Sequence, residues 1–129
     1  MLTPVEPRVS VLVADVQALG PAHWQVNWLV HNDGLAPLAL EAAWIPHGRF
    51  RGDGRVPLSG DLDAGASTQL TFSVTAHEEP DTIVENTFLI LRVLSNGQAW
   101  RIFIRMRIEF DEHAIPRPVV ELITTQPIT

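Results

Sequence analysis

The chain of 129 residues has the length of one ordinary domain, and its 46% hydrophobic and 19% charged residues are typical of a globular protein rather than a disordered one. The formal net charge of −6 argues against a nucleic-acid-binding protein, which would carry a basic surface. All nine basic residues are arginine, and the absence of cysteine excludes disulfides, thiolate nucleophiles and thiolate metal sites.

The N-terminal segment lacks the basic start and the apolar stretch of a signal peptide. The apolar runs along the chain are also too short to span a membrane. We therefore expect a cytoplasmic protein without a membrane partner, although the same sequence is compatible with a piece of a longer, exported protein.

Apolar and polar residues alternate along most of the chain, which is typical of β-strands that bury one face. In chain order, strands are predicted at residues 8–16, 23–31, 38–45, 56–62 and 67–76, with a long exposed loop at residues 46–57. Ten prolines and eight glycines separate these short runs, and no stretch has the period of a long helix.

The clearest element is a hairpin of residues 87–94 and 99–110, which follows an acidic loop at residues 77–85. The two strands are joined by Asn96-Gly97, the dipeptide that best predicts a two-residue hairpin turn. This turn fixes the core face of the hairpin as three facing pairs: Leu89 with Ile104, Leu91 with Ile102, and Val93 with Trp100. The tail contains one more candidate strand, residues 119–124, whose neighbouring prolines indicate an edge position.

These elements predict an all-β fold, an immunoglobulin-like antiparallel β-sandwich of about seven or eight strands with a C-terminal extension. We expect residues 1–112 to form the sandwich. Residues 113–129 are expected to form a tail that packs on the sandwich or on a partner.

Residues 24–76 resemble the middle of bacterial immunoglobulin-like families, namely the CARDB adhesion-type modules and the intracellular proteinase inhibitors of the BsuPI type. The shared features are the alternating strand 24–30, the turn Asn32-Asp33-Gly34 with Pro37-Leu38 after it, and residues 62–67 followed by Leu70 and Phe72. The resemblance implies the fold. It transfers no site residues, since no inhibitory loop in the chain matches residue by residue.

The second face of the hairpin combines apolar and basic residues: Phe88, Ile90, Arg92, Arg101, Phe103, Arg105 and Arg107. Arginine and aromatic residues are enriched in protein interfaces. This face therefore predicts docking of an acidic or amphipathic protein, or of a second copy of the chain. Alternatively the chain covers the face itself, with Glu41, Glu109 or the tail pairing the arginines and residues 119–123 covering the rings.

The loop at residues 46–57 contains Arg49, Phe50, Arg51 and Arg55, a set that suits an anionic ligand. A solvated turn without a ligand is the simpler interpretation of the same residues. Loops on a rigid sandwich commonly carry recognition, so this one is predicted to act together with the hairpin face.

The sequence contains no motif of an established catalytic type, and its five histidines lack metal-ligand spacing. We expect no catalytic residues, cofactor or metal, and predict a non-enzymatic protein-interaction or assembly module. One alternative, from the resemblance alone, is an intracellular proteinase inhibitor. The other is a small hydrolase that uses the acidic loop 77–85, which predicts a concave pocket joining that loop to His77 or His113.

Overall fold

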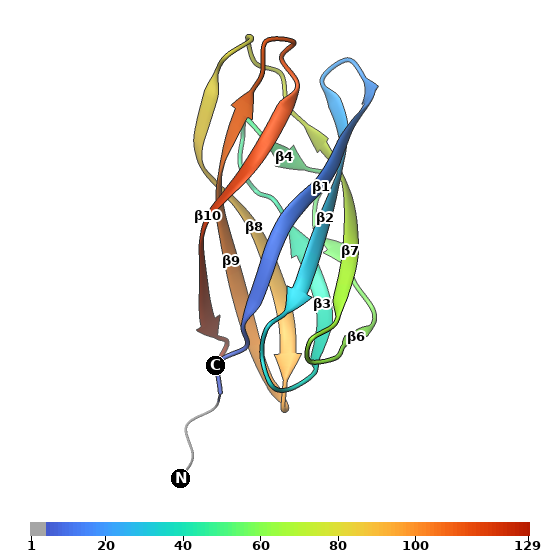
Figure 1. Ribbon diagram of the computed structural model, residues 1–129, viewed down its shortest axis with the longest axis vertical. Helices are drawn as coiled ribbons and strands as arrows, with labels where there is room; N and C mark the ends of the chain where they lie inside the picture. The colour runs from blue at the N-terminus through green and yellow to red at the C-terminus, as the bar shows by residue number, and fades with distance from the viewer. Residues whose placement is uncertain (1–4) are drawn as a thin grey trace.

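The computed structural model describes residues 5–129, so residues 1–4 of the predicted sandwich lie outside the described part (Figure 1). The strands are β1 (Val9–Gly20), β2 (His23–Asn32), β3 (Leu38–Trp44), β4 (Arg51–Gly52), β5 (Val56–Pro57), β6 (Asp61–Leu62), β7 (Ser67–Thr75), β8 (Ile83–Ser95), β9 (Gln98–Phe110) and β10 (Pro116–Pro127). Residues 5–129 contain no helix with the length and apolar character that crossing a membrane requires.

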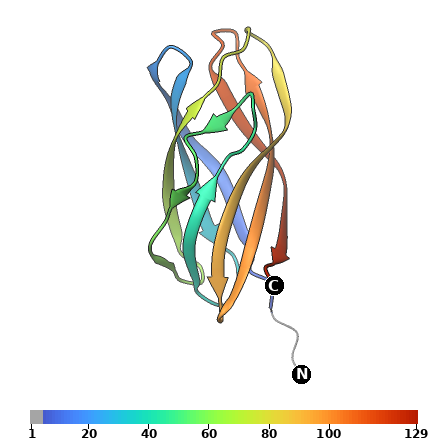
Figure 2. The ribbon, with the colours of Figure 1, turned by 180° about the vertical axis from the view of Figure 1, so that it is seen from behind.

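The strands form two antiparallel sheets that pack face to face (Figures 1 and 2). Sheet A has the order β1-β2-β7-β4, and sheet B has the order β10-β9-β8-β3-β5, with β6 paired to β3. The orders β1-β2-β7-β4 and β3-β8-β9 correspond to the two sheets of an immunoglobulin-like sandwich. The predicted all-β sandwich is therefore confirmed, with two to three more short strands than expected.

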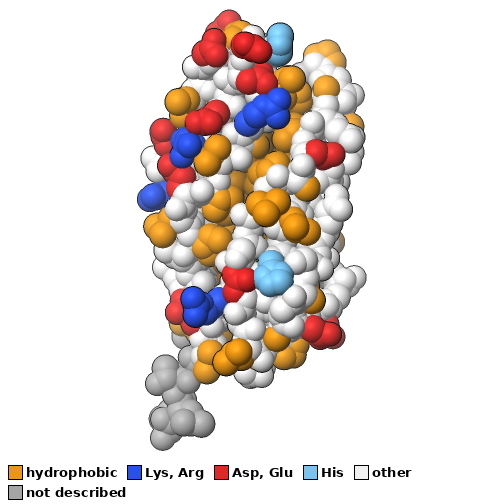
Figure 3. Space-filling model, in the orientation of Figure 1, with side chains coloured by type: hydrophobic (Ala, Val, Ile, Leu, Met, Phe, Trp, Pro, Cys, Tyr) orange, Lys and Arg blue, Asp and Glu red, His pale blue; other side chains and the backbone are white. Residues whose placement is uncertain are grey.

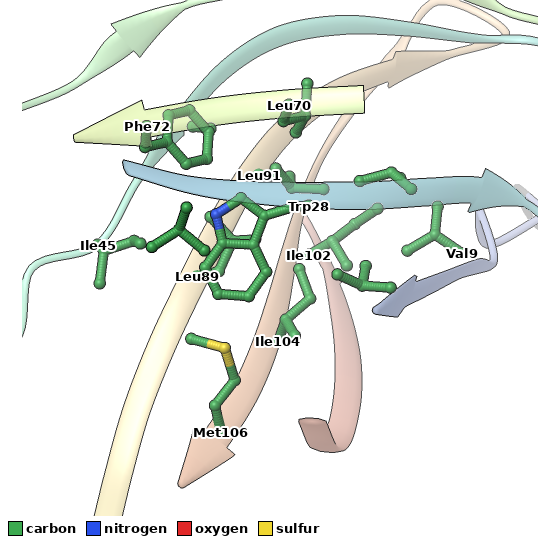
Figure 4. Packing of buried hydrophobic residues seen from close by; sticks show 14 of the residues in the cluster. Val9, Trp28, Ile45, Leu70, Phe72, Leu89, Leu91, Ile102, Ile104 and Met106 are labelled. Carbon is green, nitrogen blue, oxygen red and sulfur yellow. The ribbon is translucent and has the colours of Figure 1, made fainter. Parts of the chain in front are cut away.

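The core lies between the sheets and is filled from both sides by the apolar half of each alternating strand (Figure 4). Trp28 of β2 is fully buried and packs among residues of β8 and β9. The predicted core face of the hairpin is confirmed, since Leu89, Leu91, Ile102 and Ile104 all have 0% exposure.

The β8–β9 hairpin has the predicted turn and the predicted register. Asn96 and Gly97 have φ values of 50° and 77°, as a type I′ turn requires at both central positions. The ladder pairs Val93 with Trp100 and continues to Thr87 opposite Met106 before a bulge shifts it. Strand β8 begins at Ile83, so the acidic loop is shorter than predicted.

Asn32 connects the two segments that resemble the bacterial immunoglobulin-like families. Its side chain is 1% exposed, donates from Nδ2 to the carbonyl oxygens of Ala36 (2.9 Å) and Leu62 (3.0 Å), and accepts from the Gly34 N–H (2.9 Å). Its backbone bonds with Gly65 and Ala66, at 2.9 Å each. The turn after β2 and the turn before β7 are therefore held together by one buried amide.

The C-terminal tail is a full edge strand of sheet B. Strand β10 pairs antiparallel with β9, from Pro116 opposite Phe110 to Pro127 opposite Trp100, and is longer than the predicted strand 119–124. The strand thus lies beside β9 rather than over its outer side chains (Figure 1).

Residues 46–57 do not form one exposed loop. The chain leaves sheet B after β3, pairs with β7 of sheet A through β4, and returns to β3 through β5. This crossing turns Phe50 into the core, where its exposure is 0%. The prediction that Phe50 helps to bind a ligand at the surface is therefore wrong, because pairing of β4 with β7 carries the ring between the sheets.

Candidate functional site

The site is the outer face of sheet B, where strand registers align solvent-facing side chains into rows. The central row consists of Trp44, Ile90, Phe103 and Thr124, from β3, β8, β9 and β10 respectively. The row on one side consists of Ala42, Arg92, Arg101 and Gln126. The row on the other side consists of Phe88, Arg105 and Leu122. The predicted set on the hairpin is thus brought together on one face, with the tail contributing residues at its edge.

The apolar part of this face is half-buried by its own neighbours and carries no covering strand. The rings of Phe88 and Phe103 meet edge to face, with centroids 6.5 Å apart and planes at 87°. Phe88, Ile90, Phe103 and Trp44 all keep part of their surface exposed. Because β10 lies beside β9, the alternative in which residues 119–123 cover the rings is wrong.

Three of the four arginines on this face are paired within the chain. Arg92 Nε lies 3.1 Å from Glu41, Arg107 lies 3.0 Å from Glu109 and 3.4 Å from Glu121, and Arg105 lies 4.0 Å from Glu121. The hydrogen bond to Glu109 further raises the pKa of the Arg107 guanidinium. For these three arginines, the structure therefore shows the alternative in which the chain's own glutamates pair with them.

Arg101 is the exception on this face. It stands directly opposite Arg92 in the ladder, is exposed, and has no carboxylate partner among residues 5–129. Two arginines in facing positions repel each other unless an anion intervenes. Glu41 supplies such an anion to Arg92 only, so Arg101 is the cation that remains available to a partner.

The arginines of residues 46–57 have separate environments. Arg49 is bound by Glu78 of the acidic loop, and this hydrogen bond is the main cause that lowers the pKa of Glu78. The guanidinium of Arg55 lies over the ring of Trp44, 4.5 Å from its centroid. Arg51 is exposed and has no ion pair among the described residues. Arg51 and Arg55 are therefore placed to meet a ligand, whereas Arg49 already has an intramolecular partner.

A second apolar surface follows the seam between β1 and β10, where Figure 3 shows hydrophobic side chains along the middle of the molecule. Val13 and Val16 of β1 and Val120 and Ile123 of β10 are partly buried and pack against the core. These side chains close the open side of the sandwich. The seam is consequently a boundary of the core at which apolar side chains keep part of their surface exposed.

The hydrolase alternative predicts a pocket at the acidic loop. Five hollows over residues 5–129 are lined by residues other than those of the loop, His77 and His113. In the same part of the chain, no group of three or more His, Asp or Glu side chains is arranged to hold a metal ion. Glu78, the half-buried member of the loop, serves as the partner of Arg49.

Trp44 and Leu122 belong to the site but were not among the predicted site residues. Trp44 lies at the end of a correctly predicted strand, yet its neighbour Ile90 follows only from the pairing of β3 with β8. That pairing contains a bulge at Glu41, which single-strand alternation does not reveal. Neither a protein-family model nor a curated protein matches the chain, so the interpretation rests on this geometry.

Proposed function

We propose that the protein is a non-enzymatic interaction module that binds an acidic, amphipathic segment of another protein on the outer face of sheet B. The supporting observation is the uncovered apolar row beside Arg101, a cation without an intramolecular partner. Aromatic side chains and arginine are the residue types that dominate protein interfaces energetically. A cytoplasmic location is part of the same proposal.

Charge favours an acidic partner over a second copy. The face carries the four hairpin arginines, with Arg55 stacked on Trp44 beside them, against three glutamates, whereas the whole chain has a net charge of −6. An acidic segment would neutralise Arg101 while its apolar residues cover Phe103 and Ile90. Two copies packed through the same face would instead bring equal positive faces together, which opposes association.

The kinship with CARDB or BsuPI-type families is also a proposal. It is supported by the buried Asn32 amide, which joins the two matching turns. The inhibitor function of the second family has no additional support from the geometry. It predicts slower cleavage by serine proteases when the protein is in excess, and unchanged rates across a protease panel would remove it.

A nuclear magnetic resonance titration with a defined probe tests the docking proposal. The probe is a short synthetic peptide in which leucine alternates with glutamate, and the control peptide has lysine in place of glutamate. We expect the acidic peptide alone to shift amide signals of residues 88–92 and 101–105, with binding that weakens in salt. Equal binding of the lysine peptide, or shifts confined to sheet A, would contradict the proposal.

Matched variants test whether the arginines of sheet B bind the acidic peptide. Arg101→Glu/Arg105→Glu should weaken binding of the acidic peptide by at least about tenfold without changing the fold, because charge pairs at an interface become repulsive. Arg8→Glu is the control, since Arg8 is exposed and, among residues 5–129, has no ion pair. Glu41→Gln should strengthen binding by releasing Arg92. Equal losses in the Arg8 and Arg101 variants would overturn the assignment to sheet B.

Light scattering of the parent protein tests whether a second copy of the chain occupies the outer face of sheet B. A monomer supports a different protein as the partner. A dimer that Arg101→Glu/Arg105→Glu separates into monomers would replace the proposed partner with a second copy of the chain.

A further inference from the structure

A hollow of about 520 Å³ lies where the chain crosses between the sheets, between the end of β3, β4 and the turn that follows β4. Its walls include Trp44, Ile45, Pro46, Arg51, Asp53 and Arg55. This volume falls within the range of small-ligand sites in proteins. The hollow shares Trp44 with the outer face of sheet B, but the hairpin residues Arg101 and Arg105 are not among its walls, so variants of those two arginines distinguish its chemistry from docking on that face.

The loop that forms the hollow is fixed by its own backbone. The N–H of Gly52 donates to the carbonyl oxygen of Ile45 at 3.0 Å, and Pro46 forms an isolated bridge with Arg51. Gly54 has φ of +85°, a conformation that favours glycine and reverses the chain toward β5. Arg55 follows this reversal and is thereby placed over the indole ring of Trp44.

The walls combine an apolar side with two available cations. Trp44 and Pro46 provide apolar surface, whereas Ile45 is buried in the core. Arg51 and Arg55 have no ion pair among residues 5–129, and stacking on Trp44 limits the freedom of the Arg55 fork. Guanidinium groups bind carboxylates through paired hydrogen bonds, and a guanidinium group that is already ordered loses less entropy when it binds.

Asp53 limits the charge of a suitable ligand. It is the acidic residue among the walls, so two arginines and one aspartate leave the hollow with one net positive charge. A dianion would face Asp53 with an excess of negative charge, whereas a monoanion balances the site. We propose that this hollow binds a carboxylate monoanion attached to an apolar body. Such a group occurs in free organic acids and at the C-terminus of a polypeptide that ends in an apolar residue.

The test uses phenylacetate as the probe and 2-phenylethanol as its neutral counterpart. We expect phenylacetate to shift the indole N–H signal of Trp44 in a saturable manner, with 2-phenylethanol at least about tenfold weaker because it lacks the charge. Inorganic phosphate should shift it less than phenylacetate. Equal binding of the alcohol, stronger binding of phosphate, or an unmoved Trp44 signal would each overturn the proposal.

Variants identify the groups that bind the carboxylate. Arg51→Gln leaves the Arg55–Trp44 stack in place and should weaken phenylacetate binding several-fold, and Arg51→Gln/Arg55→Gln should weaken it by at least about tenfold. Arg8→Gln is the matched control and should bind as the parent does. Unchanged binding in both arginine variants of the hollow would contradict the assignment.

Two further experiments distinguish a free organic acid from the C-terminus of a polypeptide, and the site in the hollow from the docking face of sheet B. A tripeptide Gly-Gly-Phe with a free C-terminus is compared with its C-terminal amide, and binding of the free acid alone at the strength of phenylacetate indicates a polypeptide end. Arg101→Glu/Arg105→Glu should leave phenylacetate binding unchanged. Loss of phenylacetate binding in that variant would place the carboxylate at the hairpin face and overturn the site in the hollow.

Discussion

Both sheets bury an apolar inner face, but they present different chemistry to solvent. The outer face of sheet A carries uncharged polar residues at its centre, among them Gln25, Asn27, Thr71 and Ser73. The outer face of sheet B carries half-buried rings with arginines around them. Both faces follow from the same period-two alternation, so the difference does not arise from a demand of folding. It marks sheet B as the face whose composition needs another explanation.

Several polar groups on sheet A bond to one another. Asn27, 7% exposed, donates to the carboxylate of Asp15 on β1 and accepts from the hydroxyl of Thr71 on β7 at 2.6 Å. His31 similarly lies 2.7 Å from the hydroxyl of Ser67. On sheet B, Arg101 has no such partner among residues 5–129, and the rings keep part of their surface exposed. Sheet A thus pairs polar groups at its centre, and sheet B leaves a cation and rings that a partner can use.

The largest expected effect comes from removing the rings of sheet B. Phe88→Ala/Phe103→Ala should lower the free energy of unfolding by about 3 kcal/mol, because two half-buried rings and their edge-to-face contact are lost. Urea unfolding measures this change. The same variant should also lose binding of the acidic peptide.

The control for that variant lies on sheet A. Gln25→Ala/Gln69→Ala removes two side chains that point outward in neighbouring strands, and it should change stability by no more than about 1 kcal/mol. Peptide binding should remain. Equal destabilisation by the two double variants would mean that the faces contribute alike, and the contrast between them would lose its energetic basis.

A smaller effect is expected from breaking the polar row of sheet A. Asn27→Ala should cost about 1 kcal/mol, since two hydrogen bonds are lost but Asp15 and Thr71 remain exposed and can bond to water. Urea unfolding measures the cost, and binding of the acidic peptide to sheet B should not change. A loss of peptide binding in this variant would show that the two faces are coupled through the sandwich.

The sequence predicts local pairing better than long-range pairing. Asn96-Gly97 dictates positive φ at two adjacent residues, and this fixed the whole register from Ser95 to Thr87 as well as the inward and outward faces. The prolines near residues 119–124 predict an edge strand, and β10 lies at the edge of sheet B, but Pro116 and Pro127 begin and end a strand longer than predicted.

Three environments at the candidate site do not follow from the sequence, for one physical reason. The environments of Phe50, Trp44 and Arg49 depend on segments far along the chain. Pairing of β4 with β7 buries Phe50, pairing of β3 with β8 places Trp44 beside Ile90, and Glu78 binds Arg49 from a different loop. Alternation within one strand contains no information on these contacts.

The smallest expected effect is on stability in acid, and it is expected from carboxyl groups in the loops rather than on the outer face of either sheet. Glu78 and Asp111 lie outside both faces, and both have lowered pKa values: Glu78 chiefly through its hydrogen bond with Arg49, and Asp111 chiefly through the hydrogen bond from the Ile115 N–H. A carboxyl with a lower pKa in the folded state stabilises the fold above its unfolded pKa. That contribution is complete above about pH 5 and disappears as pH falls through the folded pKa.

Glu78→Gln/Asp111→Asn should therefore reduce the loss of stability between pH 7 and pH 3, as measured by urea midpoints at the two pH values. The reduction should be small because both carboxyl groups are close to solvent, where ion pairs are weak. Glu85→Gln is the control, since Glu85 is exposed and has no ion pair among residues 5–129. If the double variant keeps the full acid sensitivity of the parent, that sensitivity belongs elsewhere.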